Sequence, residues 1–261
     1  METSRRSFLK AGGLCTLGLA SLPAADALAQ AALPKVMANP TALVGKKWGM
    51  VIDMKKCWEK GKEGCKDCVN ACHVTHNVPD IGNVKEEIKW IWQDEYEHAF
   101  PGQATHYNEE FIHGKKFILL CNHCTNPPCV RVCPTKATFK RKEDGIVMMD
   151  FHRCIGCRFC MAGCPYASRS FNFKEPRPFI KTELNQTFPT RERGVVEKCS
   201  FCEERLAKGQ IPACVEACKP GALVFGDLED PKSEVRKLLA SHYTIQRKLE
   251  LGTGPNIFYI V

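Results

Sequence analysis

Residues 154–165 read Cys-Ile-Gly-Cys-Arg-Phe-Cys-Met-Ala-Gly-Cys-Pro, and this stretch decides how the surrounding chain must fold. Its first three cysteines lie three residues apart, and a proline follows the fourth. Thiolates are soft ligands that suit iron–sulfur clusters or zinc. Gly156 has no side chain, so the backbone can come close to a compact metal group. The stretch therefore predicts a metal-binding loop.

Three similar groups flank this stretch, and together they contain every cysteine of the chain except Cys15. Three closely spaced cysteines followed by a fourth before proline form the run found in two-cluster bacterial ferredoxins. The groups predict ligands for four 4Fe–4S clusters, enough for an electron-conducting series. In chain order they are Cys57, Cys65, Cys68 and Cys72; Cys121, Cys124, Cys129 and Cys133; Cys154, Cys157, Cys160 and Cys164; and Cys199, Cys202, Cys214 and Cys218.

Zinc and disulfides are the alternatives at these cysteines. Structural zinc usually takes two separated pairs of ligands, whereas three of the groups crowd their cysteines together. The last group alone has a spacing that zinc would accept. An exported chain rich in cysteine would ordinarily form disulfides. Clusters nevertheless remain the favoured interpretation, because the run at 154–165 is specific.

The N-terminus predicts export. Arg5 and Arg6 form a twin-arginine motif, a mildly apolar stretch follows, and Ala27-Leu28-Ala29 fits a cleavage site. We expect a signal peptide over 1–29, with the protein placed in the periplasm. The twin-arginine route carries folded proteins, which suits clusters inserted in the reducing cytoplasm. An ordinary amphipathic N-terminal helix is the alternative.

Charge and hydropathy limit the possible partners. The 261-residue chain has a formal net charge of +8, and each four-thiolate cluster would contribute about −2. The loaded protein is then close to neutral, and nucleic-acid binding is not indicated. Beyond residue 30 no apolar run is long enough to cross a bilayer. We therefore expect contact with a membrane only through partner proteins.

Short apolar strands lead into the cysteine groups, at 51–53, 117–120, 148–149 and 195–196. The exits at 134–139 and 219–225 repeat a proline followed by another apolar strand. Asp53 and Asp150 each precede a first cysteine by four residues and are expected to cap its loop. The repeating unit of strand, cluster loop, short helix and strand predicts an α+β fold.

The intervening segments have a different character. An insertion at 76–116 carries alternating Ile88, Trp90 and Trp92, which predicts a strand packed by one face. Residues 171–194 contain several prolines and predict an extended connector. Near the C-terminus, Asp230-Pro231 predicts the start of a helix with one apolar face. That face comprises Val235, Leu238 and Leu239.

The cysteine motifs resemble those of the four-cluster electron-transfer subunits of the dimethyl-sulfoxide-reductase superfamily, over roughly residues 48–261. The resemblance rests on residues 121–129 and on 198–226, with Cys199-x2-Cys202, Gly209-x2-Pro212-x-Cys214 and Cys218. It implies two nested bacterial-type ferredoxin-like domains with insertions and a C-terminal helix/strand tail. The outer domain would comprise 48–116 plus 195–261, with insertion 76–116. The inner domain would comprise 117–170, with 171–194 as the connector.

The resemblance also implies how the cysteines are shared among clusters. The first set is Cys57, Cys65, Cys68 and Cys218; the second is Cys72, Cys199, Cys202 and Cys214; the third is Cys121, Cys124, Cys129 and Cys164; the fourth is Cys133, Cys154, Cys157 and Cys160. Cys57 departs from the family pattern, because seven residues that are expected to loop out separate it from Cys65. Cys72 departs too, since His73 follows it in place of proline.

Within this superfamily the chain is most similar to the periplasmic iron–sulfur subunits of the Dsr membrane complexes of sulfur metabolism. That similarity, based on the run 150–160 and the absence of a C-terminal anchor, implies two partners: a polytopic quinone-interacting membrane subunit and a multihaem cytochrome c. The alternative is a subunit of a periplasmic molybdoenzyme that reduces tetrathionate, polysulfide or nitrite. A third hypothesis treats the clusters as structural elements of an assembly scaffold.

No motif in the sequence predicts a catalytic residue or a substrate site. His73, His123 and His152 lie beside cysteines, but each cluster already has four thiols. We expect these histidines to serve as neighbours of the ligands or as surface residues. Trp90 and Trp92 are expected to serve in packing. The predicted role is that of a redox subunit within an oxidoreductase complex.

Overall fold

The computed structural model describes residues 39–61, 64–105, 107, 109–112 and 114–261. The predicted signal peptide 1–29, with Cys15, lies outside these residues. The fold described below is that of the unit Thr41–Val261. Among the described residues, no helix has the length and apolar character that a bilayer crossing requires.

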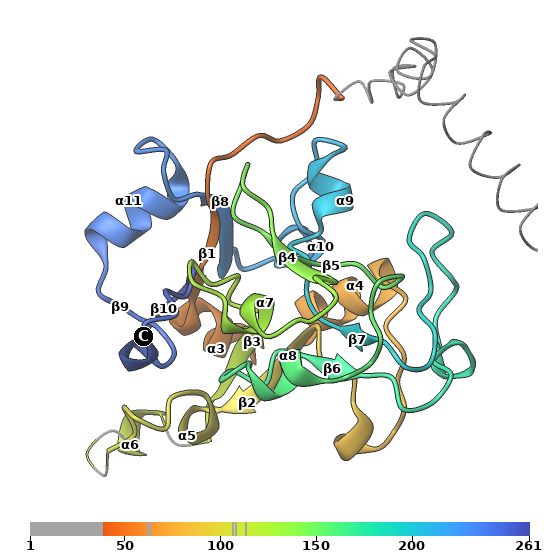
Figure 1. The fold of residues 1–261 in the computed structure, drawn as a ribbon. Helices are drawn as coiled ribbons and strands as arrows, with labels where there is room; N and C mark the ends of the chain where they lie inside the picture. The colour runs from red at the N-terminus through yellow and green to blue at the C-terminus, as the bar shows by residue number, and fades with distance from the viewer. Residues whose placement is uncertain (1–38, 62–63, 106, 108, 113) are drawn as a thin grey trace, which may run out of the picture. The chain divides into compact units, whose positions relative to one another are not determined.

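A four-stranded sheet joins the beginning of the unit to its end (Figure 1). Its order is β8 (Leu223–Asp227), β1 (Trp48–Asp53), β10 (Ile257–Ile260) and β9 (Thr244–Ile245). Strand β1 runs antiparallel to β8 and parallel to β10. The N-terminal strand therefore lies between two strands that are more than 160 residues away along the chain.

Both faces of β1 are covered, as a sheet with a parallel pair requires. Met50 and Ile52 are fully buried in the main core, while Val51 points the other way. Helix α11 (Glu234–Ser241) packs on that second face, where Val235 contacts Val51. This explains why the strand is a continuous apolar run with no polar alternation.

Three two-stranded ribbons complete the strand content of the described residues. Strand β2 (Ile91–Glu95) pairs with β3 (Lys116–Leu120), and β4 (Thr138–Lys140) pairs with β5 (Val147–Met149). Strand β6 (Ser170–Phe171) pairs with β7 (Val196–Glu197). Because β3, β5 and β7 each end shortly before a cysteine group, the ribbons fix where the loops begin.

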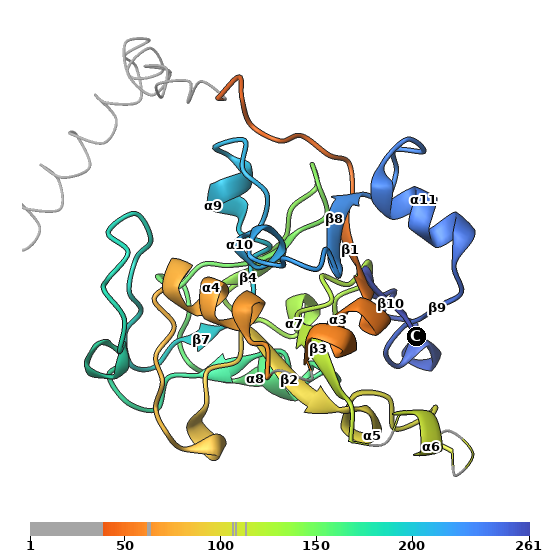
Figure 2. The ribbon, with the colours of Figure 1, turned by 180° about the vertical axis from the view of Figure 1, so that it is seen from behind.

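The cysteines lie on or beside short helices. The longest are α3 (Met54–Gly61) and α4 (Asp67–Thr75), and α4 packs against α10 (Ala213–Glu216), as Figure 2 shows. Helices this short are not stable alone in water, so they depend on contacts around the thiols. The other helices are α5 (Tyr96–Ala99), α6 (Glu109–Ile112), α7 (Pro128–Arg131), α8 (Phe159–Ala162), α9 (Glu203–Leu206), η1 (Val84–Glu86), η3 (Arg177–Phe179) and η4 (Leu249–Leu251).

The strands predicted at 51–53, 117–120 and 148–149 are confirmed by β1, β3 and β5, and the one at 195–196 begins one residue later as β7. The prediction of a one-faced strand in the insertion was wrong. Trp90, Ile91 and Trp92 are all buried, because the β2–β3 ribbon is packed inside the main core. The sequence alternates, but both sides of the ribbon are covered.

The predicted start of the C-terminal helix was also wrong, by three residues. Ser233 is the N-cap of α11, and its Oγ accepts a hydrogen bond from the Arg236 N–H at 3.3 Å. Asp230 instead accepts from the Lys232 N–H and closes the preceding turn. Both residue types are good caps. The choice follows from a second bond, in which the Ser233 hydroxyl donates to the Asp227 carbonyl at 2.7 Å.

Candidate iron–sulfur sites

The structure brings the first predicted set of thiols together from α3, α4 and the loop before β8. Burial raises the pKa of Cys57 to about 11, and the nearby thiols of Cys218 and Cys65 raise it further. Burial likewise raises the pKa of Cys68 to about 12, with Cys57, Cys218 and Cys65 as its thiol neighbours. The chain after Cys57 does not loop out at once, as the sequence suggested, but continues α3 as far as Gly61.

The second set is buried between α4 and the segment that carries α9 and α10. Burial raises the pKa of Cys72 well above its ordinary value, and Cys202, Cys199 and Cys214 raise it further. All four side chains are less than a tenth exposed. Cys72, which lacks the expected proline after it, therefore lies with the three cysteines of the last group.

The third set surrounds a cavity. Cys121, Cys124, Cys129 and Cys164 all line it. Burial raises the pKa of Cys124 to about 12, and the thiols of Cys121, Cys129 and Cys164 contribute to the increase. Cys164 belongs to the next cysteine group along the chain, so this cavity combines thiols from two groups.

In the fourth set the structure places Cys160 beside Cys154, because burial and this neighbouring thiol raise the pKa of Cys160. Cys133 differs: burial opposes its ionisation, but hydrogen bonds from the Thr138 N–H and Thr135 outweigh burial and lower its pKa. Cys157 is exposed. The membership of Cys133 and Cys157 in this set stays a prediction.

The chemistry of these thiols fits a bound metal group. All the cysteines among the described residues are free, and most of them are buried. Buried thiols that raise one another's pKa cannot ionise together without a positive charge between them. A metal ion replaces the protons and supplies that charge. The four-thiol arrangement of the third set suits a 4Fe–4S cluster, and it would also suit zinc.

Thiols of consecutive sets also lie close enough to affect one another's pKa, which arranges the sets in a series. The linking pairs are Cys68 with Cys72, Cys121 with Cys199, and Cys129 with Cys160. The second set is fully buried, whereas the first and fourth sets contain half-buried cysteines such as Cys57 and Cys154. The series therefore runs through the interior and reaches the surface at its two ends.

Two buried cations accompany the thiols and were missed by sequence reasoning. The Lys198 ammonium donates to the carbonyls of Val147 and Cys199, the latter at 2.6 Å. The Arg169 guanidinium donates to the Cys129 sulfur at 3.1 Å. Neither cation forms an ion pair with a carboxylate within the part of the chain that the structure describes. No sequence signal separates them from the many surface lysines and arginines.

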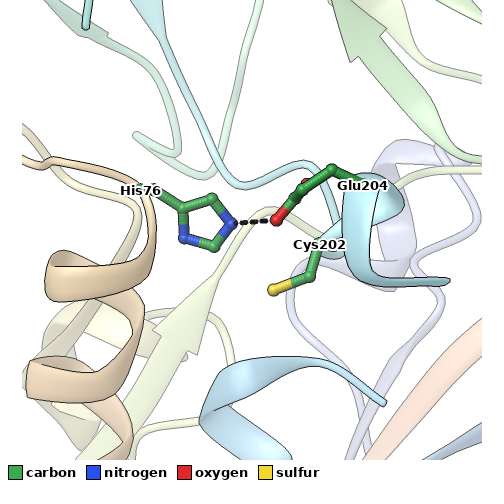
Figure 3. A group of neighbouring side chains, drawn as sticks. All are labelled: His76, Cys202 and Glu204. Carbon is green, nitrogen blue, oxygen red and sulfur yellow. Dashed lines mark hydrogen bonds and ion pairs between the residues drawn. The ribbon is translucent and has the colours of Figure 1, made fainter. Parts of the chain in front are cut away.

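A buried histidine borders the second set (Figure 3). His76 Nε2 lies 3.0 Å from Glu204 Oε1, and its Nδ1 lies 2.8 Å from the Cys72 carbonyl oxygen. The ring stacks on Trp90 with centroids 4.5 Å apart. His76, Glu204 and Cys202 come close enough to hold an ion. Because Cys202 belongs to the second set, these residues form the edge of that site.

The residues flanking the cysteines behave largely as predicted. Asp53 accepts from the Lys56 N–H, and Asp150 accepts from the His152 and Arg153 N–H groups. Both aspartates therefore cap their loops, which confirms the prediction. His123 is fully buried and stacks on a phenylalanine. His76 was not predicted from the sequence, although it follows Cys72 by one helical turn, and that spacing was the available signal.

Comparison with known proteins gives consistent matches. The family model of the 4Fe-4S dicluster domain matches residues 112–177 and 182–228. The chain is 41% identical to an iron–sulfur subunit of the Hdr-like menaquinol oxidoreductase of Archaeoglobus fulgidus, over 98% of this chain and 97% of that protein. It is 34% identical to a tetrathionate reductase subunit of Salmonella typhimurium, over 100% and 89%. A menaquinone reductase iron–sulfur subunit of Nitratidesulfovibrio vulgaris is 36% identical, over 82% and 88%.

Proposed function

We propose that this chain, which belongs to the family of 4Fe–4S subunits of respiratory oxidoreductases, transfers electrons between two protein partners through four 4Fe–4S clusters. One observation carries the proposal. Thiols of consecutive sets lie close enough to influence one another electrostatically, with the second set fully buried and the ends of the series closer to the surface. A protein that used metal only for stability would not need such a continuous series.

Each set of thiols would hold one cluster, which when bound accepts and releases a single electron. The polypeptide spaces the sets and excludes water from the inner ones. Backbone N–H groups and buried cations beside the sulfurs favour the more negative, reduced state. The proposed role is electron transfer for a catalytic partner.

The proposal includes the two nested domains. The outer domain comprises 48–116 plus 195–261 and the inner one 117–170, with the connector 171–194 between them. Its support is that β1 pairs with β8 and β10, so that distant parts of the chain share one sheet. The proposed compartment is the periplasm, reached through the twin-arginine segment within 1–29. The support for export is the sequence motif alone.

The proposed neighbours are a quinone-interacting membrane subunit and a multihaem cytochrome c, as in the Dsr complexes of sulfur metabolism. Relatives named as subunits of menaquinol and menaquinone oxidoreductases favour the quinone-linked partner. The second candidate is a molybdoenzyme subunit, favoured by the relatives from tetrathionate and polysulfide reductases. Purification of the native complex in mild detergent decides between them, since a molybdopterin subunit would contradict the Dsr assignment.

The test of electron transfer is chemical analysis followed by redox titration. Protein purified without oxygen should contain about 16 iron and 16 sulfide atoms per chain. Its EPR signals should appear and disappear reversibly as the potential is changed. Folded protein without iron, or with zinc in its place, would contradict the proposal. Clusters that show no reversible reduction would support the scaffold hypothesis instead.

A further inference from the structure

Arg169 joins two of the predicted sites through one side chain. The residue lies directly before β6, and its side chain is almost entirely buried. Nη2 donates to the Cys129 sulfur at 3.1 Å and to the Thr138 hydroxyl at 2.6 Å. Cys160 packs in the same buried cluster as Cys129 and lies within electrostatic range of the guanidinium. Cys129 belongs to the third set and Cys160 to the fourth, so a single cation lies beside both.

The negative charge around this cation comes from sulfur. A buried guanidinium keeps its proton and is normally paired with a carboxylate. Among the residues described by the structure, Arg169 has no carboxylate partner. The groups around it are instead cysteine sulfurs, with Cys129 at 3.1 Å and Cys160 in the same buried cluster. Thiolates at these positions would balance the charge of the guanidinium.

A fixed cation of this kind acts unequally on the two redox states of a cluster. Reduction adds one electron and one negative charge, with no bond formed or broken and no proton moved. N–H···S hydrogen bonds and a nearby positive charge stabilise the more negative state and raise the reduction potential. Arg169 should therefore separate the two halves of the series.

We propose that Arg169 is a positioning residue that raises the reduction potentials of the third and fourth clusters together, relative to the first and second. The inference rests on the proposed function, in which the thiols hold 4Fe–4S clusters. Arg169 would thereby bias an electron in the series toward the half built from 117–170. A transferred electron oxidises one cluster by one unit and reduces its neighbour by one unit.

The test compares Arg169→Gln with Arg169→Lys by potentiometric titration followed by EPR. Arg169→Gln removes the charge and should lower two of the four midpoint potentials. At a fixed applied potential, the ratio of reduced to oxidised cluster should fall at least tenfold at each of these two clusters. A tenfold fall corresponds to a decrease of about 59 mV in the midpoint potential of a one-electron couple. Arg169→Lys keeps the charge, so the midpoint potentials of the third and fourth clusters should stay close to those of the wild type. If the two variants lower these potentials equally, the proposal is overturned.

Arg153→Gln is the matched control. Arg153 directly precedes Cys154, but its side chain is 66% exposed and pairs with Asp150. Solvent screens an exposed charge, so this variant should leave all four potentials within error of the wild type. If Arg153→Gln shifts the potentials as much as Arg169→Gln does, the proposal is overturned. An exposed arginine that is merely next to a cysteine in the sequence would then have the same effect as the buried one.

Iron and sulfide assays separate this inference from the proposed function. Wild-type protein that holds no clusters would contradict the function itself. Variants with four clusters and unchanged potentials, or with all four potentials shifted equally, would overturn only the role of Arg169. If Arg169→Gln fails to fold, wild-type protein labelled with guanidino-¹⁵N arginine replaces it. Electron–nuclear double resonance should then detect ¹⁵N coupling to the reduced clusters, and its absence would overturn the proposal.

Discussion

Glu197 is the residue whose replacement should most weaken the fold outside the cysteines. Its carboxylate is fully buried on β7 and contacts Arg191 Nε at 2.8 Å. The Trp90 indole N–H donates to the same oxygen at 2.8 Å, and the Asn172 amide donates to the other at 2.6 Å. Arg191 in turn donates to the Asn77 carbonyl at 2.9 Å. This network attaches the connector 171–194 to the residue directly before β2 and to the turn that follows α4.

Glu197→Gln should be strongly destabilising. Removing one partner of a buried ion pair leaves the other charge uncompensated, which costs about 3–5 kcal/mol. The NH₂ group of the new glutamine would also replace one carboxylate oxygen, so that it faces N–H donors of Trp90, Asn172 or Arg191 and cannot accept from them. The Arg191 Nε–H does not point directly at the oxygen, so its contact is chiefly electrostatic. Neutralising the carboxylate therefore removes most of that attraction, although the amide is nearly the same size.

The assay is the rate at which cluster absorbance is lost in urea without oxygen. Proteins that release cofactors on unfolding rarely refold, so their stability is a rate. If the network is already broken in the transition state of unfolding, a loss of about 3 kcal/mol in native-state stability makes unfolding about 10²-fold faster. Asp80→Asn is the control: Asp80 pairs with Lys181 at 2.6 Å, but both side chains are more than 60% exposed. It should cost about 0–1 kcal/mol.

Two results would refute this reasoning. One is an unfolding rate for Glu197→Gln within about fivefold of the wild type, which is about 1 kcal/mol. The other is additivity. Because Arg191 and Glu197 compensate each other, Arg191→Met combined with Glu197→Gln should cost less than the sum of the two single changes. A fully additive double variant would show that the pair contributes nothing as a pair.

Three further predictions follow from single residues. Cys72→Ala should remove the second cluster alone, lowering iron by about 4 of 16 atoms per chain; loss of the first cluster with it would contradict the assignment. Gly156→Ala should disrupt the fourth site, because Gly156 has φ +70° and a Cβ would lie 2.5 Å from the Gly194 carbonyl oxygen. Gly252→Ala is the control, because Gly252 has φ +63° but a Cβ there would meet open space. It should lower the free energy of unfolding by only about 1–2 kcal/mol, and equal thermal stability of the Gly156→Ala and Gly252→Ala variants would contradict the prediction. Ser233→Ala should cost about 1 kcal/mol by removing the cap of α11, measured by urea unfolding and compared with Ser233→Thr.

Local features of the fold could be predicted from the sequence because they depend on neighbouring residues. The apolar runs before each cysteine group became β1, β3, β5 and β7, and Asp53 and Asp150 capped their loops. These signals repeat with the cysteines. Ligand spacing restricts the chain so tightly that few other local structures are possible.

Long-range features could not be predicted in the same way. The sequence of residues 48–53 does not indicate that this strand pairs with 223–227 and 257–260. Arg169, Arg191 and Glu197 look like surface charges in the sequence, and only their burial reveals their roles. The start of α11 was misplaced for a similar reason. Asp230 and Ser233 are equally suitable caps, and a contact with the distant Asp227 carbonyl decided between them.

The central position of β1 has a consequence for the order of biosynthesis. A ribosome produces 48–53 long before β8 and β10 exist, so this strand waits unpaired for most of translation. The first and second thiol sets wait as well, because each includes cysteines beyond residue 198. The third and fourth sets are complete once Cys164 has emerged. Cluster insertion should therefore begin in the middle of the chain and finish with the ends. A nascent polypeptide stalled where Cys164 has emerged from the ribosome and Cys199 has not should hold half the iron.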